Sequence, residues 1–102
     1  MAVIMKQVMP AAIPLSMVEA VTDEMGVEGT PPKGMLLHTH YEQDGRVHIL
    51  DVWDTEEAHQ DFLQSRLMPA MGKVAAAHGV DLAAAGPPDT VFTEVQRVIR
   101  GA

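Results

Sequence analysis

Residues 35–53 read MLLHTHYEQDGRVHILDVW and contain the clearest structural signal in the chain. Asp44 and Gly45 lie between two runs that are rich in β-branched and aromatic residues. An Asp-Gly pair tolerates the positive φ angles of a two-residue hairpin turn. The stretch therefore predicts two antiparallel strands, over residues 35–41 and 46–53.

A strand and a helix are predicted before this hairpin. Residues 3–9 are mostly apolar and end at Pro10, which has no amide proton for a sheet ladder. Ser16 and Glu19 have the spacing of a capping box, in which each side chain satisfies a free amide at a helix start. We therefore expect a helix from Ser16 to Met25.

A second helix and a last strand are predicted after the hairpin. Asp54 stands three residues before Glu57, which is typical of a capped helix start with acidic residues in its first turn. Pro69 falls inside the helical pattern, so we expect a kink or a break there, with a continuation to His78. Small residues and prolines then predict a loop over 83–89, and a final strand is expected over 91–98.

The order strand, helix, strand, strand, helix, strand is the split βαβ arrangement of a ferredoxin-like domain. We predict an α+β fold, a ferredoxin-like βαββαβ domain with a four-stranded antiparallel sheet, formed by residues 1–102 as a single domain. Two helices leave one sheet face uncovered, and an apolar face does not remain in water. We therefore expect a homodimer through that face, with contacts among Met35, Leu37, Leu50 and Val52.

The composition excludes several classes of function. The chain has 102 residues, 47% of them hydrophobic, no cysteine and a formal net charge of −7. The negative field repels nucleic acid and anionic lipid, so we expect neither as a partner. No apolar run reaches the roughly 18 residues of a membrane span, and no secretory leader is visible. A soluble, cytoplasmic protein is the expectation.

The hairpin predicts a pair of titratable side chains. In the register of a two-residue loop, His38 lies opposite Asp51, and Leu36 lies opposite Trp53. An imidazole oriented by a carboxylate acts as a general base near pH 7, so we predict His38 and Asp51 as the catalytic residues. A buried His-Asp pair that only stabilises the hairpin remains the alternative, because buried polar groups are usually paired for stability alone.

The remaining polar inventory argues against bound cofactors. His38, His40 and Asp51 are candidate ligands for zinc or non-haem iron, but no second cluster supports a metal site. No glycine-rich phosphate loop and no Gly-x-Ser-x-Gly motif is present. We therefore expect no metal and no cofactor, and we place His59 at the edge of a cavity.

The eight methionines are unusual beside four aromatic residues. Thioether side chains adapt to irregular shapes, so methionines either line a deformable apolar pocket or simply fill the core. Both interpretations apply to Met5, Met9, Met17, Met25, Met35, Met68 and Met71.

Residues 34–69 also resemble a known family. The similarity rests on Gly34-Met35-Leu36-Leu37-His38, the hairpin, the run from Asp51 to Ala58, Phe62, Arg66-Leu67 and Pro69. These features are similar to small bacterial proteins of the dimeric α+β-barrel superfamily, near the antibiotic-biosynthesis-monooxygenase-like group. The resemblance implies that two ferredoxin-like subunits pack sheet against sheet, each with a small molecule between its sheet and helices.

The resemblance and the residues together suggest a function. We expect a cofactor-independent monooxygenase, cyclase or isomerase that binds a small apolar, aromatic or polyketide-like molecule and removes a proton with histidine assistance. The expected substrate-binding residues are Leu36, His40, Trp53, His59 and Phe62. The alternative is a non-catalytic ligand-binding or dimerisation protein with a structural His-Asp pair.

Overall fold

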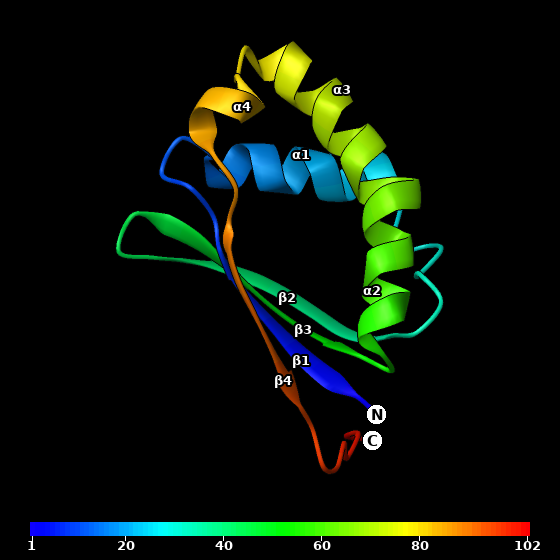
Figure 1. Cartoon of the computed structure of the whole chain (residues 1–102). Helices are drawn as coiled ribbons and strands as arrows, with labels where there is room; N and C mark the ends of the chain where they lie inside the picture. The colour runs from blue at the N-terminus through cyan, green and yellow to red at the C-terminus, as the bar shows by residue number, and fades with distance from the viewer.

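The structure is a computed structural model that describes all 102 residues. Its four strands form one antiparallel sheet in the order β2-β3-β1-β4, which confirms the predicted α+β, ferredoxin-like fold. The helices lie on one side of this sheet (Figure 1). The elements in chain order are β1 (Val3–Val8), α1 (Leu15–Met25), β2 (Met35–Gln43), β3 (Arg46–Trp53), α2 (Glu56–Phe62), the π-helical η1 (Leu63–Leu67), α3 (Met68–His78), α4 (Leu82–Ala85) and β4 (Asp89–Glu94).

The β2–β3 hairpin has the predicted two-residue turn. Asp44 and Gly45 have φ angles of 53° and 75°, and Gln43 pairs with Arg46. The ladder keeps this register as far as Leu37, so His38 lies opposite Asp51 as predicted.

The register changes at the start of β2. Met35 pairs with Trp53 and Leu37 pairs with Val52, so Leu36 is the extra residue of a β-bulge. The prediction that Leu36 lies opposite Trp53 is therefore wrong. The bulge also moves Met35, which was expected on the uncovered face, into the core around Trp53.

Both helix starts differ from the predicted caps. Helix α1 begins at Leu15 after Pro14, without a side-chain cap, so the proposed capping box of Ser16 and Glu19 is wrong. Helix α2 is capped by Thr55, whose hydroxyl accepts the amide proton of Ala58 at 3.0 Å, one residue later than expected.

The helical segment passes Pro69 without a gap. The predicted kink or break takes the form of η1, a π-helical segment in which Met68 donates its amide proton to the carbonyl of Leu63. Proline has no amide proton and its ring crowds the preceding turn, so a wider turn just before Pro69 relieves both problems.

The C-terminal region differs most from the expectation. The predicted loop contains α4, because the Asp81 carboxylate accepts amide protons from Ala83 and Ala84 at 3.0 and 3.3 Å. Strand β4 ends at Glu94, short of the predicted residue 98, because Glu94 pairs with Val3 at the very start of β1. No helix in the structure has both the length and the apolar character needed to cross a bilayer.

Two groups of buried side chains hold the helices on the sheet. One joins α1 and α3 to the sheet through Met17 and Val47, and the other surrounds Trp53, which is fully buried. The opposite sheet face has no helix, and there Leu37, Tyr41 and Val91 are exposed.

Candidate functional site

An apolar cavity of about 280 Å³ lies between the sheet and the helices. Sixteen of its 23 lining residues are hydrophobic. This volume lies just below the range of roughly 300–1,000 Å³ that is usual for small-molecule sites. The cavity is therefore suited to a compact, largely apolar ligand.

Methionines form much of the cavity wall. Every methionine except Met1 contributes to the lining: Met5, Met9, Met17, Met25, Met35, Met68 and Met71. Met5, Met9 and Met17 are also buried core residues, so the same methionines line the cavity and fill the core. Such a wall changes shape at low cost because thioether side chains are flexible.

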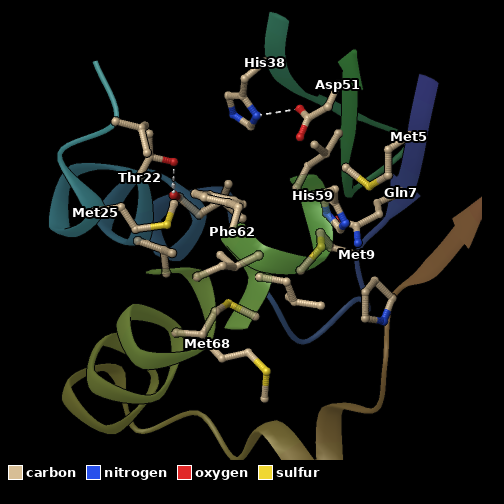
Figure 2. Close-up of a pocket in the computed structure, with 18 of the residues that line it drawn as sticks. Met5, Gln7, Met9, Thr22, Met25, His38, Asp51, His59, Phe62 and Met68 are labelled. Atoms are coloured by element: carbon tan, nitrogen blue, oxygen red, sulfur yellow. Dashed lines mark hydrogen bonds and ion pairs between the residues drawn. The ribbon is translucent and has the colours of Figure 1, made fainter. Parts of the chain in front are cut away.

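Three titratable side chains line this cavity. Figure 2 shows His38 and Asp51 joined on the sheet, and His59, from α2, lying apart from this pair. The carboxylate of Asp51 is buried and contacts His38 Nδ1 through Oδ1 at 2.7 Å. Its second oxygen, Oδ2, accepts the indole proton of Trp53 at 3.2 Å. These two hydrogen bonds of Asp51 therefore join the hairpin to the core around Trp53.

The hydrogen bonds continue from His38 toward the surface. His38 Nε2 contacts His40 Nδ1 at 2.9 Å, and His40 Nε2 contacts Glu19 Oε1 at 2.6 Å. Both ring nitrogens of His38 are therefore engaged. Glu19 was missed as a site residue, since its sequence neighbourhood suggested only a helix cap.

His59 has a different environment. Its side chain is buried, and its Nδ1 atom has no hydrogen-bond partner. Burial lowers the pKa of His59, although the nearby negative charges of Asp51 and Glu56 oppose this effect. The imidazole is therefore neutral at pH 7, and it lines the cavity with one buried ring nitrogen that has no hydrogen bond within the protein.

Aromatic rings hold His59 in place. Its ring lies edge-on to Trp53 and Phe92, with centroid distances of 5.4 and 5.3 Å. Phe62 lines the cavity and packs against Trp53 at 5.3 Å. Trp53 and Phe92 thus hold the His59 ring directly, and Phe62 supports it through Trp53.

The structure brings together only some of the residues predicted as the site. His38, Asp51, His59 and Phe62 line the cavity. Trp53 lies behind Asp51 and His40 lies one hydrogen bond outside, so neither is in the lining. Leu36 is displaced by the bulge, and Met35 takes its place in the cavity wall, so the prediction that Leu36 shapes the wall is wrong.

The histidines are not arranged as a metal site. The nitrogens of His38 point at Asp51 and His40 rather than at a common centre. No group of three or more His, Asp or Glu side chains has the geometry to hold a metal ion.

Comparisons with solved structures identify the fold. A candidate antibiotic biosynthesis monooxygenase from Deinococcus radiodurans is 15% identical, with 100% of this chain and 99% of that one aligned and a TM-score of 0.62. The ActVA-Orf6 monooxygenase of Streptomyces coelicolor, solved with nanaomycin D, is 19% identical over 99% and 93%, with a TM-score of 0.59. SnoaB, a cofactor-independent oxygenase from Streptomyces nogalater, is 16% identical over 98% and 97%, with a TM-score of 0.58.

The chain has the ferredoxin-like fold of the antibiotic-biosynthesis-monooxygenase-like proteins. The structures it resembles include monooxygenases and a cofactor-independent oxygenase. No protein-family profile matches the sequence, and no curated protein matches it. Because fold alone does not select a reaction, the function must be argued from the site.

Proposed function

We propose that the protein is a cofactor-independent oxygenase, cyclase or isomerase that acts on a small aromatic or polyketide-like molecule with an acidic O–H or C–H group. One observation carries this proposal. A cavity that is otherwise largely apolar is lined by Asp51, His38 and His59. An apolar ligand with one acidic group fits this distribution of polarity.

His59 is the proposed binding residue for the ligand's oxygen. Its Nδ1 atom is the buried polar side-chain atom without a partner, and such an atom costs stability until a ligand satisfies it. A hydroxyl or carbonyl group that reaches a nitrogen of this ring gains a hydrogen bond inside a largely apolar cavity. The ligand's acidic group is then held next to Asp51 and His38.

Asp51 and His38 together are the proposed proton acceptor. His38 has no free ring nitrogen, whereas a carboxylate has about four lone-pair sites and Asp51 uses two of its own. The Asp51 carboxylate therefore receives the ligand's proton, and His38 stabilises the protonated carboxyl group through its hydrogen bond. The sequence had suggested that His38 acts directly, and the contact with His40 argues against that version.

Oxygenation at this site requires no added electron donor. A ligand CH₂ group beside a carbonyl loses one proton to the acceptor and its resulting carbanion reduces O₂. The carbon becomes a carbonyl group with one oxygen atom, and the other oxygen leaves as water with both hydrogens of the CH₂ group. The similarity of the fold to a cofactor-independent oxygenase supports this class.

A non-catalytic ligand-binding protein is the second candidate. The observation in its favour is the full occupation of His38, whose nitrogens contact Asp51 and His40 as in a structural network. In that case the cavity binds a ligand and no bond changes.

Oxygen uptake with a panel of compounds tests these two functions. The panel contains hydroxynaphthalenes, anthrones and nanaomycin D, added to the wild type and to Asp51→Asn. Asp54→Asn is the matched control, since Asp54 is exposed and lies outside the cavity. We expect uptake by the wild type and the control, and a loss of about 10²-fold or more in Asp51→Asn. Binding without oxygen uptake or product would favour the second candidate.

The proposed assembly is a homodimer through the uncovered sheet face. Leu37, Tyr41 and Val91 expose 49%, 46% and 61% of their surfaces there. These side chains form a patch that a second copy of the same sheet would cover.

A further inference from the structure

We propose that Glu19 and His40 complete a proton relay that connects the cavity to solvent. In this relay the ring nitrogens of His38 and His40 together carry three protons, which is one more than two neutral imidazoles carry. The use of this relay in catalysis rests on the proposed function, but its proton content does not. Three short contacts define it: Asp51 to His38 at 2.7 Å, His38 to His40 at 2.9 Å, and His40 to Glu19 at 2.6 Å.

The number of protons follows from the order of the groups. Each of the three contacts needs one proton to be a hydrogen bond, and ionised carboxylates at both ends donate none. Two neutral imidazoles supply only two protons. In one of the three contacts, two lone pairs would then face each other with no proton between them. All three distances fit hydrogen bonds, so the histidine pair carries a third proton. His38 and His40 share one positive charge between two carboxylates.

The exposure of its two end groups gives the relay a direction. Asp51 is buried, with 4% of its side chain exposed, whereas the Glu19 side chain is 56% exposed. His38 and His40 lie between them, and only His38 and Asp51 reach the cavity. The chain of hydrogen bonds thus begins at the ligand site and ends in water.

A proton passes through this chain without net change in the protein. The ligand's O–H or C–H bond breaks, its electron pair stays on the ligand, and the proton joins the Asp51 end. At the other end, the proton between the two rings moves onto His40 Nδ1, and His40 Nε2 gives its proton to Glu19 and then to water. Asp51 is then protonated and both imidazoles are neutral. Three protons are restored on the histidine pair when Asp51 gives its proton to the departing product and His40 Nε2 regains one from water.

Two amide substitutions each remove one proton from the histidine pair and leave it in opposite tautomers. In Glu19→Gln, the new amide donates to His40 Nε2, so both histidines become neutral with their protons on Nδ1. In Asp51→Asn, the new amide donates to His38 Nδ1, so both become neutral with their protons on Nε2. Glu24→Gln is the matched control, because Glu24 lies on the same helix and pairs with Lys73.

Nitrogen-15 NMR of the histidine rings in the full chain, without ligand, measures these states. We expect one imidazolium charge shared by His38 and His40 in the wild type and in Glu24→Gln, and loss of that charge in the other two variants with opposite tautomers. Two neutral rings in the wild type, or the same tautomers in both variants, would overturn the relay. Trp53 fluorescence verifies that each variant is folded, since Trp53 is the single tryptophan and is buried.

Turnover then separates the relay from the proposed function. If the relay serves catalysis, Glu19→Gln lowers turnover and Glu24→Gln does not. Full turnover in Glu19→Gln, despite a lost proton, overturns the catalytic use of the relay and leaves the proposed function intact. If NMR confirms three protons on the histidine pair but no compound is turned over, the result counts against the proposed function and not against the relay.

Discussion

Replacing His59 with phenylalanine is expected to make the protein more stable while removing ligand binding. Natural binding sites often contain groups that cost stability, and His59 is such a group because its buried Nδ1 has no partner. Phenylalanine has a similar shape and fits the aromatic surroundings of Trp53 and Phe92. The gain in stability and the loss of binding therefore have one physical cause.

The magnitude follows from the environment of the ring. A buried polar atom without a hydrogen bond costs about 1–3 kcal/mol, and the slightly larger phenyl ring extends toward the cavity at some cost in packing. We expect the free energy of unfolding to rise by about 1–2 kcal/mol, with about 4–8 °C in melting temperature for each kcal/mol.

The effect also depends on pH. Burial lowers the pKa of His59 below its ordinary value of 6.5. Between the lowered pKa and 6.5, the unfolded chain binds a proton that the folded chain does not, so stability falls as pH falls through this window. Above it, the contribution of His59 no longer changes with pH. In the His59→Phe variant, the part of the pH dependence of stability that comes from His59 is absent.

Urea unfolding followed by Trp53 fluorescence, from about pH 5 to about pH 7.5, measures both quantities. His78→Gln serves as the control, since His78 is exposed at the end of α3. A His59→Phe variant that is less stable than the wild type, or that keeps the wild-type slope while binding ligand normally, would refute the reasoning.

Four further predictions follow from the same structure. Phe62→Ala is expected to lose about 3–5 kcal/mol of stability in urea unfolding, because Phe62 is buried against Trp53, and a loss under about 1 kcal/mol would mean that the packing is wrong. Light scattering should find a dimer for the wild type and a monomer for Leu37→Lys, and a wild-type monomer at micromolar concentration would contradict the assembly. Turnover should survive treatment with a chelator, whereas loss that one particular ion restores would show metal dependence. His38→Gln should abolish turnover with little change in melting temperature, and a loss of about 1–3 kcal/mol with ligand affinity kept would favour a structural role.

The local turn signal made part of the site predictable. Asp44 and Gly45 set a two-residue loop, and its register alone placed His38 opposite Asp51. Strand alternation then put His40 on the same face. Local chemistry decides these features, so the sequence is sufficient for them.

Other parts depend on contacts between distant segments. The bulge at Leu36 leaves no recognisable mark in the sequence, yet it replaces Leu36 with Met35 in the cavity wall. Glu19 fits a helix cap by spacing, but α1 starts earlier and its docking on the sheet brings Glu19 to His40. The short helix α4 does not depend on distant contacts. It was predicted as a loop, although Asp81 before a run of alanines is a recognisable helix cap.

The central claim is that the methionine-lined cavity is the ligand site, and the methionine methyl groups test it directly. Seven of the eight methionines line the cavity, and the exposed Met1 is an internal control. The protein is labelled with ¹³C at these methyl groups and titrated with 2-naphthol in an NMR experiment. The account predicts saturable shifts of the buried Met5, Met9 and Met17 signals, with Met1 unchanged. Shifts confined to Met1 and the exposed Met68, or no saturable shift at all, would contradict it.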